Sequence, residues 1–215
     1  MALLRTNYLD YSYIMMDRLQ QLESQWRELL SRPRSKEEEE EMSVLAEQLT
    51  IETEKEIIGL INELKKAGIV ITSIWDLVNT KKEYPEAIDI LLKYLPLAKH
   101  EKNKEGIVRA LTVKEAKGKA SSLLIKEYEN TPKKKDNLRW VIGNAIATVM
   151  TSQDIDWLIS TVTDKTNGGS RRQLVKALRT VKSQQAIDVL NGLLDDQEMK
   201  STALEVLKKI KYNSR

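Results

Sequence analysis

Three cations in the segment GGSRRQLVKALRTV, residues 168–181, have types and spacing that could hold a charged partner. Arg172, Lys176 and Arg179 follow one another at i, i+4 and i+7, so a helix would carry all three on one face. The apolar residues between them fall on the opposite face. Such a row could bind a phosphate backbone or an acidic protein surface, or it could be the solvated side of a structural helix.

Residues for catalysis are scarce. The chain has one histidine, His100, and no cysteine, so the sequence offers no ordinary Ser-His-Asp triad, thiolate or multi-histidine metal site. His100 lies in the polar stretch KHEKNKE and is expected to be a loop residue. Asn167, Gly168 and Gly169 lack the Gly-Lys-Ser/Thr ending of a phosphate-binding loop. We therefore predict no catalytic residue, no cofactor-binding residue, no cofactor and no metal ligand.

Composition narrows the class of protein. With 41% hydrophobic and 31% charged residues in 215, the chain is expected to fold and to be soluble. Phenylalanine is absent, so the core must be largely aliphatic. The lack of cysteine favours a cytoplasmic location. No apolar run is long enough to span a membrane. The first residues, MALLRTNYLDYSY, do not have the pattern of a signal peptide.

Charge is unevenly distributed. Residues 1–83 hold 11 Lys/Arg and 16 Asp/Glu, a net charge of −5, whereas residues 84–215 hold the remaining 24 and 16, a net charge of +8. This asymmetry indicates two different surfaces. The positive balance is moderate and falls short of a dedicated nucleic-acid binder.

The first 68 residues predict a long antiparallel helical hairpin. Pro33 separates a helix at about 7–31 from one at about 36–67, because proline cannot continue a helix. Ser35 and Glu38 have the spacing of a capping box, and Gly68 that of a C-terminal cap. Negative side chains in the run EEEEE, residues 37–41, suit the positive end of the helix dipole. Each helix has an apolar stripe, formed by Met15, Leu19, Leu22, Trp26 and Leu29 in the first and by Met42, Leu45, Leu49, Ile57, Leu60 and Leu64 in the second.

Residues 69–215 repeat with a period of about 33 residues. The segment YPEAIDILLKYL at 84–95 returns as SQQAIDVLNGLL at 183–194, with two weaker copies between them. One equivalent position in the first helix of each unit holds Ala87, Ala120, Asp154 and Ala186. A second helix follows each first one, with a small residue at Ala110, Ala145, Ala177 and Ala203. Two helices per unit at this period predict an α-solenoid, continuous with the hairpin, which is either a cap or a divergent repeat.

These units resemble the HEAT and HEAT-like (phycobilisome-lyase type) repeats. The last unit, AIDVLNGLLDDQEMKSTALEVLKKI at 186–210, is the most similar, with Asp195 and Asp196 between its helices and Met199, Lys200 and Ala203 in the second. The resemblance covers residues 84–211 and implies an all-α fold. It also implies that the second helix of each unit lines a concave surface, where proteins of this architecture bind macromolecules.

The basic row is then expected to face that groove. Shifting the row back by one repeat gives Trp140 in the second unit, and shifting it back by two gives Glu105 and Arg109 in the first. Shifting it forward gives Glu198 and Glu205 in the fourth unit, so the positive charge is local. We name as candidate partner-binding residues Arg172, Lys176, Arg179, Arg109, Trp140 and Arg139. Arginine and aromatic anchors of this kind are typical of protein interfaces.

The sequence therefore predicts a non-enzymatic scaffold or adaptor whose partner is another protein. A nucleic-acid partner remains an alternative. So does a HEAT-like alkylpurine DNA glycosylase, since Trp140 and Trp157 have Asp154 and Asp156 nearby, although Trp157 falls on a core position. Homo-oligomerisation through Met15, Leu22, Trp26 and Leu29 is a further alternative, if that stripe does not pack on the second helix.

Overall fold

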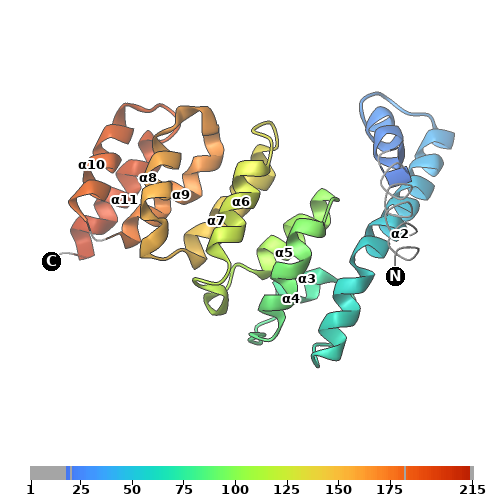
Figure 1. The fold of residues 1–215 in the computed structure, drawn as a ribbon. Helices are drawn as coiled ribbons and strands as arrows, with labels where there is room; N and C mark the ends of the chain where they lie inside the picture. Colours follow the sequence, from blue (N-terminus) through green and yellow to red (C-terminus); the bar gives the residue numbers. More distant parts are fainter. Residues whose placement is uncertain (1–17, 20, 182, 214–215) are drawn as a thin grey trace, which may run out of the picture.

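A computed structural model of the chain describes residues 18–19, 21–181 and 183–213, with side chains through residue 210. All the regular secondary structure in this part of the chain is helical, as the sequence predicts. The helices follow one another along the chain, from the N-terminal hairpin at one end of the described part to α11 at the other (Figure 1). The segment GIVIT at 68–72 is a non-helical connection.

The N-terminal hairpin forms with the predicted end of its first helix and the predicted ends of its second; the predicted start of the first helix lies outside the described residues. Residues 18–19 and 21–30 are helical, and α2 runs over Lys36–Lys66. The Ser35 hydroxyl accepts the Glu38 backbone N–H while a Glu38 carboxylate oxygen accepts that of Ser35, which confirms the capping box. At the other end Gly68 adopts φ 84°, and the Ile69 N–H donates to Leu64 O at 2.9 Å, the Schellman arrangement for which glycine is preferred.

Acid is expected to weaken the start of α2 through Glu38. A hydrogen bond from Arg32 and one from the Ser35 backbone hold the pKa of the Glu38 carboxyl at about 2. A depressed carboxyl pKa stabilises the folded state above the unfolded pKa, about 4.3, and this contribution disappears as pH falls towards 2. Between pH 5 and 2, we expect the free energy of unfolding to fall less in the Glu38→Gln variant than in the parent. Urea unfolding followed by circular dichroism measures this difference. Equal acid sensitivity of the two proteins would contradict this assignment.

The apolar stripe of the first helix packs on α2. Leu22 and Leu29 are buried with Leu45, and Trp26 lies against them. The condition for homo-oligomerisation through this stripe is therefore not met at Leu22 and Leu29, because the hairpin covers them. Met15, the remaining residue of that hypothesis, lies outside the described residues.

The rest of the chain begins with one short helix, which packs against the second helix of the first pair, and continues as four helix pairs. The helices are α3 (Ile74–Asn79), α4 (Ala87–Tyr94), α5 (Glu101–Ala110), α6 (Ser121–Asn130), α7 (Asp136–Val149), α8 (Ile155–Thr163), α9 (Arg171–Ala177), α10 (Gln184–Gly192) and α11 (Lys200–Asn213). Within a pair the two helices contact one another, as α6 does with α7 and α10 with α11. The second helix of each pair also contacts the second helix of the next pair: α5 contacts α7, α7 contacts α9, and α9 contacts α11. Successive pairs therefore pack together through their second helices.

The small residues of the second helices lie at these contacts. Ala110, Ala145 and Ala203 are fully buried and Ala177 nearly so. Small side chains allow neighbouring helices to approach within about 8–10 Å. In the first helices Leu91, Leu124, Leu158 and Leu190 are all fully buried at equivalent places. Asp154 departs from this pattern, because its carboxylate accepts the Thr151 N–H and caps the start of the third unit instead of packing in the core.

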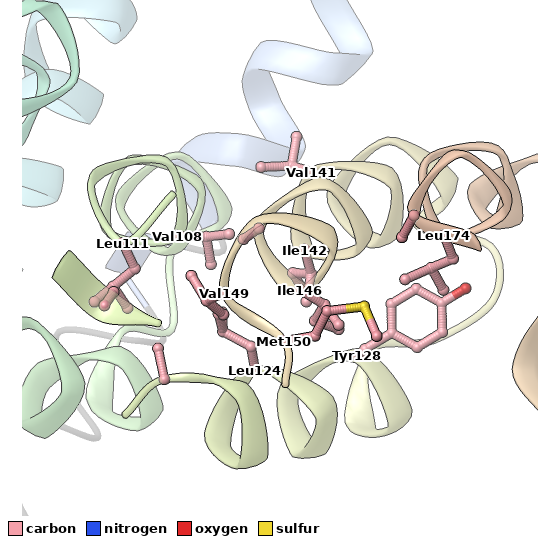
Figure 2. Close-up of a cluster of buried hydrophobic side chains, with 14 of the residues drawn as sticks. Val108, Leu111, Leu124, Tyr128, Val141, Ile142, Ile146, Val149, Met150 and Leu174 are labelled. Carbon is pink, nitrogen blue, oxygen red and sulfur yellow. The ribbon is translucent and has the colours of Figure 1, made fainter. Parts of the chain in front are cut away.

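One apolar cluster extends from the second half of α2 to α11. Its middle is drawn in Figure 2, where side chains from α5, α6, α7 and α9 meet. Most residues of the cluster are aliphatic, and Tyr128 and Met150 pack between them. The predicted aliphatic core is confirmed, and it is shared along successive pairs instead of being enclosed within any one of them.

Candidate partner-binding surface

The predicted basic row is on the surface. Arg172 and Lys176 project from α9, and Arg179 from the 3₁₀ turn that follows it at Leu178–Thr180; all three are exposed. The residues of the opposite face, including Leu174, Val175 and Leu178, are fully buried. No side chain of the row joins an ion pair or hydrogen bond within the part of the chain that the structure describes. The row is therefore free to contact a partner.

Carboxylates border the row at both ends. At one end, Arg172 and Asp136 both lie next to Gly169. Arg172 Nη1 and Asp136 Oδ2 are 3.6 and 3.5 Å from the position that a Cβ on this glycine would occupy. At the other end is Glu205 of α11. A hydrogen bond from Lys209 lowers the pKa of the Glu205 carboxyl, and the charges of Lys176 and Arg179 lower it further. The positive surface is a short strip between acids, as the repeat offsets predict.

Arg109 and Trp140 are only partly available. Arg109 Nε donates to Glu105 Oε1 at 2.8 Å, so an acid of the same helix already neutralises it. The Trp140 ring is half-buried and packs against the apolar cluster. Arg109 is on α5 and Trp140 is on α7. These helices pack in the order α5, α7, α9, and α9 carries the first two cations of the row.

Arg139 is not on the surface, and its prediction as a partner contact is wrong. Only 3% of this residue is exposed. Its Nη1 donates to the carbonyls of Tyr128 and Thr131 at 2.8 and 2.9 Å, and its Nη2 to Asn167 Oδ1 at 2.7 Å. The guanidinium also stacks over the Tyr128 ring, 4.0 Å from its centre. This arginine joins the second unit to the turn of the third.

Arg139 belongs to a set of three cations that link neighbouring units. Each lies six residues before the small residue of its second helix. Lys104 Nζ reaches Glu127 of the next unit at 2.5 Å, and Arg171 Nη1 reaches Asp196 at 2.9 Å. Arg171 is 1% exposed and also donates to the carbonyls of Val162 and Gly168. The same offset is visible in the sequence, but the sequence reasoning did not use it.

The residues behind the glycosylase alternative have structural partners. Trp157 packs edge-on against Tyr128, with ring centres 5.7 Å apart, and its indole N–H donates to Glu129. Asp154 is occupied by the Thr151 cap. Trp140 packs on the core as described above, which leaves Asp156 as the exposed member. The positions of Trp140 and Trp157 are therefore explained by their packing in the fold.

His100 lies outside the helices, as the sequence predicts, but it has partners in the fold. It precedes α5, its side chain is mostly buried, and its Nε2 lies 3.1 Å from Glu23 Oε1 of the first helix. The carboxylate of Glu56 accepts the His100 N–H, and Asn103 donates to the same carboxylate. These contacts attach the hairpin to α5. The nearby hydroxyls of Thr50 and Thr53 donate to backbone carbonyls one turn earlier, so neither is positioned as a nucleophile for the imidazole.

Across the described residues, no group of three or more His, Asp or Glu side chains could hold a metal ion, and no helix combines the length and apolar character needed to cross a membrane. Comparison with known proteins adds no relative: no family model, curated protein or solved structure matches the chain. What the chain does must therefore be argued from its own surface.

Proposed function

We propose that the chain is a HEAT-like α-solenoid that works without catalysis as a cytoplasmic scaffold or adaptor for another protein. The succession of second helices and the buried alanine in each support the solenoid. The surface formed by the exposed sides of α5, α7 and α9 is where the partner binds. The observation that carries the proposal is the exposed row of Arg172, Lys176 and Arg179, which joins no ion pair or hydrogen bond among the described residues.

The chemistry of the row favours an acidic protein segment. Long cations without internal ion pairs keep their donors available for carboxylates, and arginine binds a carboxylate with two parallel hydrogen bonds. Trp140 adds a half-exposed aromatic ring beside the row. The strip ends at Asp136 and Glu205, which limits the length of acidic chain that it can accept and would repel a longer polyanion.

Reversing the charge of the row is expected to abolish binding of the partner. The triple variant Arg172→Glu, Lys176→Glu and Arg179→Glu should fold, because all three side chains are exposed, but should recover at most about a tenth of the partner in affinity capture from the native cell. Mass spectrometry identifies the proteins captured. The matched control reverses three other exposed lysines that join no ion pair among the described residues, Lys81, Lys82 and Lys117, and should capture as much as the parent.

Undiminished capture by the row variant would remove this surface from the proposal. The same proteins also separate the two alternatives. Duplex DNA or RNA binding that falls steeply between 50 and 200 mM salt would favour a nucleic-acid partner, since each phosphate contact releases counterions. Release of bases from alkylated DNA would favour the glycosylase. We expect neither signal.

A further inference from the structure

The outer side of α2 carries an apolar stripe with no partner in the described chain. Val44, Ile51 and Ile58 are 54%, 44% and 53% exposed. They are seven residues apart, the spacing at which two paired helices keep the same side chains in contact over several turns. Isolated exposed apolar residues are ordinary, but three β-branched residues in one line are a patch that a folded protein seldom leaves in water.

The stripe is separate from the surfaces that hold the hairpin together. At about 100° per residue, the stripe points about 180° away from the side of α2 that carries Leu45, Leu60 and Leu64. These three are buried, Leu45 against the first helix and the other two in the main cluster. A second helix can therefore lie along the stripe without displacing either contact.

We propose that this stripe is a self-association surface, on which α2 of a second copy packs antiparallel with Ile51 at the two-fold axis. Residues at equal distances on either side of Ile51 then face one another. Val44 meets Ile58. Glu47 meets Lys55, whose Nζ also donates to Glu52 Oε1 of its own helix at 2.9 Å, and this contact forms twice by symmetry. The stripe is complementary to itself in both shape and charge.

The ends of α2 fix the direction. Its first turn is acidic, with Glu37, Glu38 and Glu39, and its last turn holds Lys65 and Lys66. An antiparallel pair places the acidic end of one helix beside the basic end of the other and opposes the two helix dipoles. A parallel pair would bring the two acidic ends together and the two basic ends together, which is unfavourable at both ends.

The surface beside the stripe has room for side chains of the second copy. A hollow of about 480 Å³ borders Ile51 and Ile58, and Ile61 and Thr72 also line it. Glu54 and Lys55 line the same hollow and supply a polar edge. An apolar centre with charged residues at its margin is the usual composition of a protein interface.

Single cysteines test both the pairing and its direction, because the natural chain contains none. A disulfide requires Cβ atoms about 3.5–4.5 Å apart. Ile51→Cys lies on the two-fold axis and should therefore cross-link to itself under mild oxidation, at least about tenfold faster than Leu204→Cys, an exposed control on α11. Val44→Cys should not cross-link to itself, since the two copies lie about 21 Å apart along the helices. A mixture of Val44→Cys with a tagged Ile58→Cys chain should form the mixed dimer.

The unmodified protein supplies an independent measurement. Sedimentation equilibrium should show a monomer–dimer equilibrium, and Ile51→Glu should raise the dimer dissociation constant at least about tenfold, because the charge would be buried at the centre of the interface. Equal oxidation rates for Ile51→Cys and Leu204→Cys, or a monomer at every concentration, would overturn the proposal. Self-cross-linking of Val44→Cys as fast as that of Ile51→Cys would overturn the antiparallel direction.

This inference does not rest on the proposed function. The row of Arg172, Lys176 and Arg179 is on α9, and the stripe is on α2 near the other end of the succession of helices (Figure 1). Loss of the dimer in Ile51→Glu with unchanged partner capture would support the stripe alone, and the opposite result would support the row alone.

Discussion

Replacement of Arg171 by methionine is expected to lower the free energy of unfolding by about 3–5 kcal/mol, the cost of leaving one member of a buried ion pair without the other. Arg171 is almost fully buried, and Asp196, its partner at 2.9 Å, is buried as well. Methionine can fill much of the space of the arginine stem. It cannot replace the donors that Arg171 directs to Val162 O and Gly168 O.

Urea unfolding followed by circular dichroism measures this effect. The matched control is Arg172→Met, one residue along the same helix, where the side chain is exposed and the change should stay within about 0.5 kcal/mol. The double variant Arg171→Met with Asp196→Leu should recover a large part of the loss, because no buried charge is then unpaired. Equal unfolding midpoints for the two single variants would contradict the structural role of Arg171.

The same pair makes stability depend on pH. Burial by itself raises the pKa of Asp196, but the hydrogen bond and charge of Arg171, with the backbone N–H groups of Glu198 and Met199, outweigh it and hold that pKa below the ordinary value. A depressed carboxyl pKa stabilises the fold at pH values above the unfolded pKa, about 3.9, and the contribution is lost as pH falls below it. This acid-dependent contribution should be absent from the double variant.

Leu124→Ala is expected to cost about 2–5 kcal/mol, the range for removing a large aliphatic side chain from a packed interior. Leu124 is fully buried in α6 and belongs to the cluster around Tyr128 and Met150 (Figure 2). That cluster receives side chains from the first, second and third units, so the cavity would weaken the contacts between pairs as well as the pair itself.

Leu97→Ala is the control for this substitution. Leu97 lies in the turn between α4 and α5 and is exposed, so its truncation should change the free energy of unfolding by no more than about 0.5 kcal/mol. Both variants can be followed by the same urea experiment. If Leu124→Ala is as stable as Leu97→Ala, the shared core between successive pairs is not what holds the chain together.

The two surfaces proposed above fit the uneven charge of the sequence. The stripe on α2 lies in the part with net charge −5 and the basic row in the part with net charge +8. In an adaptor, one surface would hold a second copy and the other would hold the protein partner. A dimer would then present two basic rows, and linked rows raise the effective affinity for a partner with two acidic segments.

Local patterns were sufficient for the helical class and for the ends of α2. A capping box, a glycine after the last turn and apolar residues at helical spacing act within a few residues, so they can be read without knowledge of the distant chain. The buried positions of Ala110, Ala145 and Ala203 followed from the repeat for the same reason. The exposure of Arg172, Lys176 and Arg179 could also be predicted from local spacing. The apolar residues of α9 lie on the opposite face and pack in the core, so the three cations face the solvent.

Packing between distant segments decided the rest. Arg139 and Arg172 are both basic residues on second helices, and only the approach of Tyr128, Thr131 and Asn167 buries the first while the second remains in water. His100 gained Glu23 as a partner across 77 positions of sequence, a contact that no local spacing encodes. Helical period identified the stripe of α2 that is covered, with Leu45, Leu60 and Leu64, but it did not single out the second apolar stripe on the other side. The first helix and α4 cover one of these sides, which leaves Val44, Ile51 and Ile58 exposed.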